Sequence, residues 1–576
     1  MKTRLIFQNK ILALFLFGII LFCASNAFSA PSLPGPADAG RALKDKEKKF
    51  QDIGAAPEKA PSIKAPALPG YQAPQGAENV TFVLRSIEIK GSTIYQKSDL
   101  APLYKSSLGK TVTVDKIYEF AALLTQRYRN DGYALSRAVV PPQEIESGAI
   151  KIVVIEGYID TLTIVGDYKA TAVSDNIIGK VMSEKPLNMK TLERQMLLLN
   201  DLPGIAAQAI LKPVEDDSDL GATKLVLAFG EESAPVSISF DNFGSRYLGP
   251  YEASIHAAYN FFPQQQTQID GLVTTPTDEL QFIQISHKLP ISSEGTMASF
   301  SASYGHSAPG YSLESQEIRG NSYDYNIGLS QPIIRTRSEN LYLGAGLEVR
   351  NSKVDVLATE LYEDKLRILS VSGNYDVADA WRGANQLELK LSQGVDAFGA
   401  TDNDDINKSR IDGRSDFTKV TADARRLQYV SNYINLYAAA NGQYSWSPLL
   451  SSEQFGLGGQ QFGRAYDSSE LTGDSGIAGS LELQYSGLPY AFDTESQLYT
   501  FYDSGKAWSE DGPDSSLSSA GAGVRLAHAS GVSGNFSLAK PLTKKVDAPS
   551  TGNGKDVRFL FSLSYKLDNL IGSMRQ

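Results

Sequence analysis

Hydrophobic and small polar residues alternate in short runs from residue 234 to the end of the chain, without helical periodicity. The segment Ser237–Phe240 shows the pattern in its simplest form. Because side chains two residues apart on a strand share a face, the pattern predicts strands with one apolar side. Sixteen such runs lie near residues 236–243, 251–261, 267–275, 279–288, 297–304, 322–331, 340–354, 365–377, 386–393, 417–430, 433–446, 477–485, 497–505, 520–528, 534–539 and 557–567.

The middle of the chain, residues 81–232, contains two units that repeat the same order of patterns. Each unit begins with a short alternating strand, continues with apolar residues at helical spacing, and closes with two further strands. The helical pattern of each unit stops at a glycine, Gly132 in the first and Gly204 in the second, as helix ends commonly do. The order β-α-α-β-β predicts two small α+β domains, which we place at residues 79–157 and 158–232.

Residues 1–29 have the pattern of a secretory signal peptide. Three cations precede the apolar run Ile11–Ala24, and small residues around Ala27 follow it. An uncleaved anchor helix is the alternative, and the apolar run is short for one. Cys23 is the only cysteine and lies within this segment, so no disulfide is expected in the mature chain.

Residues 30–78 combine a polar helical stretch with a proline-rich linker. The stretch Ala37–Asp52 contains helix formers and almost no apolar face, so we expect it to float in water or occupy a polar cavity. Repeated prolines between Pro57 and Pro74 predict an extended, semi-stiff linker after this helix.

Composition narrows the class of protein. The chain has 54 Lys and Arg against 65 Asp and Glu, and this net charge of −11 argues against a nucleic-acid partner. The four histidines lack metal-ligand spacing and no phosphate-binding glycine loop is present, so neither a metal nor a cofactor is expected. A membrane lipase built on His306 would need an orienting carboxylate and an oxyanion motif, and neither accompanies it. We therefore do not expect an enzyme.

An even number of amphipathic strands in a secreted, cysteine-free chain predicts a transmembrane β-barrel of 16 antiparallel strands over residues 233–576. Closing the sheet pairs every backbone group in lipid, which an open sheet cannot do. A soluble β-sandwich is the alternative, but it would not explain the amphipathic last run, with Phe559, Phe561, Leu563, Tyr565 and Leu567 on one face.

The stretch Phe455–Gly476 follows the eleventh run and is too long for an ordinary hairpin loop. Arg464 is its only cation, and its aromatic residues argue against a disordered linker. We therefore expect a loop that folds back and docks. If the first strand starts at the periplasm, this stretch is the sixth outer loop.

Several segments resemble the transporters of two-partner secretion systems. Leu124–Tyr133, Pro142-Gln143 and Val154–Tyr158 are similar to the first POTRA domain of that family, and the second unit resembles its second POTRA domain. The resemblance covers about residues 37–567. It implies periplasmic domains that bind an extended client by adding a strand to an exposed sheet edge. Simple core and turn roles for these residues are the alternative.

The sixth loop carries Gly463, Arg464, Ala465 and Tyr466, followed by Asp467. This sequence resembles the Arg-Gly-aromatic tip of the family's sixth loop, which folds into the barrel. Ala465 stands where the family has glycine, so the backbone conformation at this position is an open question.

On the thirteenth run, Phe501, Asp503 and Gly505 match the family's Phe-x-Asp-x-Gly motif and share one face. The resemblance implies that this face lines the lumen and that Asp503 pairs with Arg464, as a charge-assisted bidentate pair. Alternatively, Asp503 is one of many lumen carboxylates and Arg464 binds solvent or lipopolysaccharide. Further segments that fit the family are Asp241–Ser245, Asp474–Gly476 and Leu481–Leu483.

The resemblance implies an outer-membrane translocator of a two-partner secretion system. It would export a large β-helical exoprotein, of adhesin, haemolysin or haem-binding type, with the helix at 37–52 in the lumen at rest. Expected partners are that exoprotein, outer-membrane lipid and lipopolysaccharide, with the transporter itself a monomer. An assembly factor that inserts other barrels is one alternative, although such factors usually carry three or more POTRA units. A passive porin is the other, and it would lack the periplasmic repeats.

Overall fold

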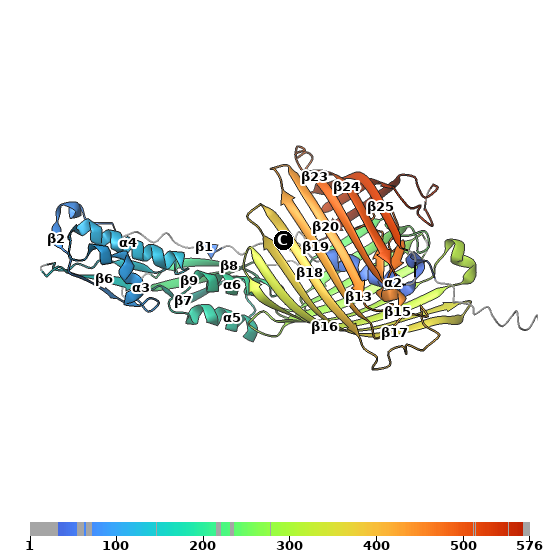
Figure 1. Ribbon diagram of the computed structural model, residues 1–576, viewed down its shortest axis with the longest axis horizontal. Coiled ribbons are helices and arrows are strands. Elements are labelled where there is room, and N and C mark those ends of the chain that lie inside the picture. The colour runs from blue at the N-terminus through green and yellow to red at the C-terminus, as the bar shows by residue number, and fades with distance from the viewer. Residues whose placement is uncertain are drawn as a thin grey trace, which may run out of the picture.

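A computed structural model describes residues 33–53, 63–64, 72–145, 147–214, 220–230, 235–276, 278–510, 512, 514–550 and 552–567. Figure 1 shows two small α/β units leading into one large barrel, with helix α2 (Ala39–Ile53) inside it. No helix in these residues is long and apolar enough to cross a membrane. The predicted signal peptide and most of the proline-rich linker lie outside the described residues, so both stay predictions.

The barrel is a closed antiparallel sheet in which consecutive barrel strands are neighbours. Its sixteen strands are β10 (Val236–Asp241), β11 (Tyr251–Tyr259), β12 (Gln266–Thr275), β13 (Leu280–Pro290), β14 (Met297–Ser307), β15 (Arg319–Arg335), β16 (Glu339–Val356), β17 (Thr359–Ala378), β18 (Gly383–Gly394), β19 (Thr418–Tyr429), β20 (Ile434–Ser445), β23 (Ser475–Tyr485), β24 (Thr494–Trp508), β25 (Ser515–His528), β26 (Val532–Pro541) and β27 (Arg558–Lys566). Each predicted run overlaps one of these strands, so the predicted barrel is confirmed.

The ring closes between its first and last strands. In this seam β10 pairs with β27 over five residue pairs, from Ser237 with Lys566 to Asp241 with Ser562. Alternation along β10 shows how the wall is built: Ile238 and Phe240 lie exposed on the outer face, whereas Asp241 is buried on the inner side. A closed ring leaves no unpaired edge, so apolar side chains can face lipid without an exposed backbone.

The first small unit has a three-stranded sheet in the order β3-β6-β5. Its helix α4 starts after Thr113, whose hydroxyl accepts a hydrogen bond from the Lys116 amide as an N-cap. Burial raises the pKa of the Tyr128 hydroxyl, which therefore stays protonated and donates to Glu156 at 2.7 Å. The elements are β2 (Thr81–Val83), β3 (Ser86–Lys90), α3 (Lys97–Leu100), η3 (Ala101–Leu103), η4 (Lys105–Ser107), β4 (Thr111–Thr113), α4 (Val114–Asn130), β5 (Arg137–Val139) and β6 (Ala149–Ile155).

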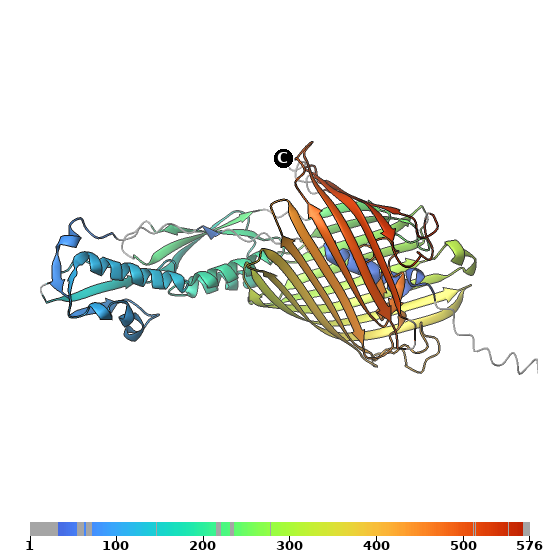
Figure 2. The same cartoon turned by 45° about the horizontal axis from the view of Figure 1, so that its top comes forward.

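The second unit has the predicted order of elements: β7 (Tyr158–Val165), α5 (Ala172–Ser183), α6 (Met189–Asn200), β8 (Ala206–Pro213) and β9 (Ala222–Gly230). Helices α4 and α6 lie end to end along the two units, as Figure 2 shows, and the Met189 amide donates to the Gly132 carbonyl at 2.9 Å. Besides β2 and β4 of the first unit, one strand of the linker was not predicted. In the linker, β1 (Ile63–Lys64) adds in parallel to the β8 edge, with Ile63 opposite Ala209.

The second unit contacts the turns at one end of the barrel. Arg335, which is 4% exposed, donates through Nε to Asp201 at 2.8 Å. Lys180 of α5 forms an ion pair of 2.6 Å with Glu294 in the turn between β13 and β14. The turns of this end therefore mark the side of the barrel on which the two small units lie.

Candidate functional site

The segment between β20 and β23 folds into the barrel instead of projecting from it. It contains η6 (Ser451–Glu453) and a small hairpin formed by β21 (Phe455–Leu457) and β22 (Leu471–Gly473). The apolar side chains of the hairpin and its tip pack on the inner wall of β24 to β27 in one buried cluster: Phe455, Leu457, Phe462, Ala465, Tyr466, Leu471, Tyr499, Phe501, Leu517 and Leu560. The loop therefore docks through an apolar surface, and this surface positions its tip.

The structure brings Arg464 and Asp503 together at this tip. The Arg464 guanidinium donates to Asp503 through Nη2 at 2.8 Å and through Nε at 3.0 Å, which makes the contact bidentate. The backbone amides of Gly463 and Arg464 donate to the same carboxylate at 3.2 and 3.0 Å. Asp503 is fully buried, so these donors replace the water that its charge would otherwise need.

Further wall residues complete this junction, which we call the loop–wall junction: Arg464, Asp503, Glu482, Ser480 and Phe501. Glu482 forms an ion pair of 2.7 Å with Arg464, and the Ser480 hydroxyl donates to Asp503 at 2.8 Å. The Arg464 guanidinium carbon lies 3.5 Å from the centre of the Phe501 ring, in cation–π geometry. One cation is thus held by two carboxylates and an aromatic face.

Tyr466 and Asp467, which also belong to the tip, make wall contacts of their own. The Tyr466 hydroxyl donates to the carbonyl of Ser518 at 3.2 Å and to that of Lys544 at 3.0 Å. Asp467 forms an ion pair of 2.8 Å with Arg558 of β27. These contacts tie the loop to the last strands of the barrel as well as to β24.

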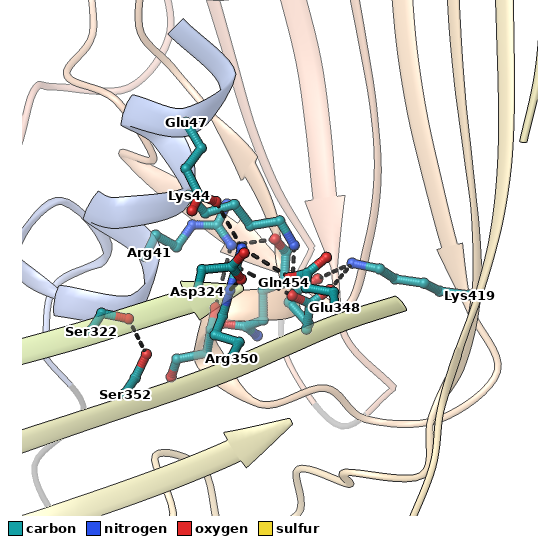
Figure 3. Close-up of polar contacts among 12 residues, drawn as sticks. Arg41, Lys44, Glu47, Ser322, Asp324, Glu348, Arg350, Ser352, Lys419 and Gln454 are labelled. Atoms are coloured by element: carbon teal, nitrogen blue, oxygen red, sulfur yellow. Dashed lines mark hydrogen bonds and ion pairs between the residues drawn. The ribbon is translucent and has the colours of Figure 1, made fainter. Parts of the chain in front are cut away.

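Helix α2 lies in the lumen and makes most of its contacts through charged side chains, as Figure 3 shows for its first turns. On one side, Glu47 pairs with Arg350 at 2.8 Å and Lys44 pairs with Glu453 at 2.8 Å. On another side, Lys49 lies 2.8 Å from Asp241. Polar side chains on opposite faces of the helix therefore meet complementary charges on the barrel wall and on η6.

The same helix has a narrow apolar stripe, which the sequence analysis did not expect. Leu43 and Phe50 are each 1% exposed, and the Phe50 ring stacks on Phe282 of β13 at a centroid distance of 5.6 Å. The expectation that this helix has almost no face to bury was therefore wrong for one side. Two apolar residues seven apart lie on the same face of a helix, and the wall offers them a matching apolar patch.

Helix α2 also contacts the sixth loop directly. Arg41 donates to the Ser469 hydroxyl at 3.0 Å and to the carbonyl of Gln454. The hydroxyls of Ser468 and Ser469 each donate to Asp45 at 2.8 Å. The helix and the loop therefore form one connected filling of the lumen.

Two family models match this sequence. Residues 221–526 match the haemolysin secretion/activation protein family ShlB/FhaC/HecB, and residues 82–157 match the ShlB-type POTRA domain. The first match alone covers more than half of the chain. The chain belongs to this family.

Relatives and solved structures agree with the family. The transporter is 24% identical to the heme/hemopexin transporter protein HuxB of Haemophilus influenzae (strain 86-028NP), over 82% of this chain and 86% of that protein. It is also 24% identical to the outer membrane transporter CdiB of Dickeya dadantii, over 72% of this chain and 75% of the relative. The structure of CdiB from Escherichia coli matches with a TM-score of 0.71 at 19% identity, covering 93% of this chain and 99% of that one.

These findings confirm the predicted family, the 16-stranded barrel and the predicted function. The chain is an outer-membrane transporter of a two-partner secretion system, with its POTRA domains in the periplasm. Its family members are transporters and are not known as enzymes. Because the POTRA units contact the barrel turns at one end, that end faces the periplasm and the sixth loop enters the lumen from outside.

Backbone conformation and close packing account for three small residues in the transporter's motifs. Gly463 has φ of 91°, in the left-handed region that favours glycine, whereas Ala465 is not among the residues with positive φ. An alanine side chain is therefore accommodated at 465. At Gly505, a Cβ atom would lie 2.6 Å from Leu457, so the loop hairpin can approach the wall only where the wall has no side chain.

Sequence reasoning found one partner of Arg464, Asp503, and missed two others, Glu482 and Ser480. It also missed Arg558, the partner of Asp467. Glu482 belongs to the segment Leu481–Leu483, which was noted as fitting the family without a role. Its place beside Arg464 follows from the pairing of β23 with β24, where Glu482 lies opposite Phe501. Alternation of polar and apolar residues in β23 points Glu482 inward, but the register cannot be read from sequence alone.

Proposed function

We propose that this transporter moves a large, extended exoprotein through its lumen, that the POTRA units dock this client, and that α2 with the sixth loop closes the lumen at rest. A β-helical exoprotein of adhesin, haemolysin or haem-binding type is the client class, and HuxB is named for haem and hemopexin. The client folds outside the cell. Backbone pairing that is absent during transit forms there, and this gives transport its direction.

The observation that carries the proposal is the way in which α2 is held. Its contacts with the wall include ion pairs from Lys44, Glu47 and Lys49, and its apolar stripe is limited to a few side chains. Moving paired charges out of a partly dry site costs little net free energy, because each charge regains hydration when its partner is lost. Such a helix can leave the lumen and return, unlike an element buried by a broad apolar face.

One edge of the second POTRA sheet supports a mode of client binding by strand addition. The β8 edge pairs in parallel with the short strand β1 from the linker, so its backbone groups lie in the geometry that strand addition needs. We propose that a client segment takes this edge in place of β1. Ile63 is the residue of β1 that lies opposite Ala209, so Ile63→Pro should remove a donor and favour the client.

We also propose that the outer surface contacts outer-membrane lipid and lipopolysaccharide and that one chain forms the working unit. Large apolar side chains such as Leu343, Leu347 and Val371 are exposed on the outer face of β16 and β17. The ring is closed by strands of the same chain, so no second copy is needed to pair an edge.

Deletion of residues 81–157 tests the docking role. We expect exoprotein in the medium to fall to background while the barrel stays in the outer membrane and keeps its heat-modifiable migration, because the barrel closes without this unit. Ile63→Pro is the contrasting variant: it should weaken the pairing of β1 with the β8 edge and leave secretion intact. Normal secretion after the deletion would show that the first POTRA unit is a spacer.

A further inference from the structure

A cavity of about 590 Å³ opens inside the barrel at its periplasmic end, on the wall formed by β23 to β27. We call it the vestibule. Its lining includes the inward-facing side chains of Ser486, Gln497, Arg525, Ser533, Asn535 and Ser562. Helix α2 reaches Asp241 and Glu252 at the outer ends of β10 and β11, so the vestibule and the helix occupy different parts of the lumen.

Arg525 is the cation of this lining. Its guanidinium stacks on the Tyr499 ring at 4.0 Å and pairs with Glu482 at 2.7 Å. The same carboxylate holds Arg464, whose guanidinium stacks on Phe501 one inward position along β24. Asp503, Arg464, Glu482 and Arg525 therefore form one chain of alternating charges, which runs from the loop–wall junction into the vestibule.

The two arginines differ in their access to a ligand. The Arg464 side chain is 12% exposed and the Arg525 side chain is 37% exposed. Within the described residues, Arg525 makes three hydrogen bonds, two to Glu482 and one to Gln497. A guanidinium has five N–H donors, so Arg525 can bind a further anion while its pair with Glu482 persists.

The lining also contains the Glu495 carboxylate and the apolar side chains of Leu488 and Tyr490, and its neutral polar groups fit a polypeptide backbone. Serine hydroxyls and the amides of Gln497 and Asn535 can each donate and accept hydrogen bonds. The backbone of the wall is already paired between neighbouring strands, so an incoming chain meets these side chains and not free backbone groups. Single neutral hydrogen bonds are individually weak, which allows binding of many sequences and easy release.

From this arrangement we infer that the vestibule is a binding subsite for an extended polypeptide segment, and that Arg525 anchors a carboxylate of that segment. The inference rests on the proposed passage of the client through the lumen. It adds that the periplasmic mouth prefers segments in which an acidic residue lies among small neutral polar ones. A client carboxylate bound to Arg525 lies next to Glu482, which also pairs with Arg464, so an occupant of the vestibule lies beside the loop–wall junction.

The test uses the purified full-length transporter and two fluorescent decapeptides of Ser, Gly and Asn, one with a central Asp and the other with Asn at that place. Fluorescence anisotropy measures their affinity. We expect the Asp peptide to bind about fivefold to tenfold more tightly, the range for a charge-assisted hydrogen bond. Arg525→Gln should remove the difference, and Arg525→Lys should restore part of it.

Arg426→Gln is the matched control, because Arg426 also lies near the periplasmic end of a barrel strand and pairs with Asp379 at 2.6 Å, outside the vestibule lining. It should keep the full preference. Equal binding of both peptides by the unaltered transporter, or an unchanged preference in Arg525→Gln, overturns the subsite. The proposed passage of the client is tested separately, by measuring exoprotein in the medium. That proposal fails if the unaltered transporter secretes no exoprotein, whichever peptide binds more tightly.

Discussion

The sixth loop and helix α2 both fill the lumen, and they are held in different ways. The loop hairpin packs an apolar cluster on β24 to β27 and adds the buried Arg464–Asp503 pair at its tip. The helix meets other parts of the wall, such as β10 and β16, through separate ion pairs, and it adds a narrow stripe around Leu43 and Phe50. The difference supports the proposal that the loop acts as a fixed part of the wall, whereas the helix closes the lumen reversibly.

The largest expected effect comes from breaking the loop's anchor. Asp503→Ala leaves Arg464 without its bidentate partner, and Arg464→Ala leaves the Asp503 charge buried without its cation. Removing one partner of a buried pair costs about 3–5 kcal/mol. We expect each single variant to lower exoprotein in the medium at least about tenfold, since about 1.4 kcal/mol corresponds to a factor of ten. Heat-modifiable barrel in the membrane should stay normal.

The double variant decides whether the two residues act as a pair. Coupled partners are not additive, so Arg464→Ala with Asp503→Ala should secrete little less than either single variant. Simple additivity would assign each residue a separate role. Full secretion by both single variants would refute the idea that this junction is central to transport.

Removal of the helix should have a strong effect on conductance and little effect on transport. A variant without residues 31–60 lacks α2 and keeps β1. We expect its single-channel conductance in planar bilayers to rise severalfold, because the polar lumen fills with water and ions, while secretion stays within about twofold of normal. Unchanged conductance would show that ions cross the barrel by a path that α2 does not block. The proposed difference in role between the helix and the sixth loop would then fail.

Weakening the helix without deleting it should give an intermediate result. Lys46 and Lys49 both pair with Glu252, and Lys49 also pairs with Asp241. We expect Lys46→Gln with Lys49→Gln to raise the fraction of open channels, and to do so more at low salt, where charge pairs in the unaltered protein are least screened. Lys105→Gln, in the first POTRA unit, serves as the control for loss of a lysine charge. An open fraction equal to that of the control would show that the remaining contacts, the Lys44 and Glu47 ion pairs and the stripe around Leu43, are enough to hold the helix.

The smallest effect is expected at Ala465. This residue is fully buried but does not need positive φ, so Ala465→Gly should keep the tip conformation and change secretion less than about twofold. Gly463→Ala is the matched contrast. Its φ of 91° disfavours alanine, so we expect a clear loss of exoprotein in the medium. Equal loss in both variants would mean that packing, and not backbone conformation, governs this turn.

Much of the barrel can be predicted from sequence because the wall obeys a single rule. Lipid lies on one side and water on the other, so each strand must alternate. The run around Phe559 keeps one face apolar, although Leu560 is apolar on the inner face, where the sixth loop packs. The pairing of Arg464 with Asp503 was expected because short motifs resembled a family. The place of Glu482 between Arg464 and Arg525 was not expected, since it depends on strand register and on a loop that crosses the lumen.

Other features escaped prediction because their signals are very short. Strand β1 has two residues, and such a pair becomes a strand only because the β8 edge is nearby. Leu43 and Phe50 look like isolated apolar residues in a charged helix until Phe282 provides a ring to stack on. In each case the deciding partner is distant in the sequence, so no local pattern can show it.

The closed ring and the enclosed helix also set a topological condition on biogenesis. Helix α2 precedes every barrel strand in the chain and lies within the ring, while the POTRA units that follow it lie outside at the periplasmic end. The seam between β10 and β27 completes the ring with the last strand to be synthesised. Either the barrel closes around the N-terminal segment, or that segment is drawn through the finished ring. A stably folded domain fused ahead of α2 would be compatible only with the first order of events.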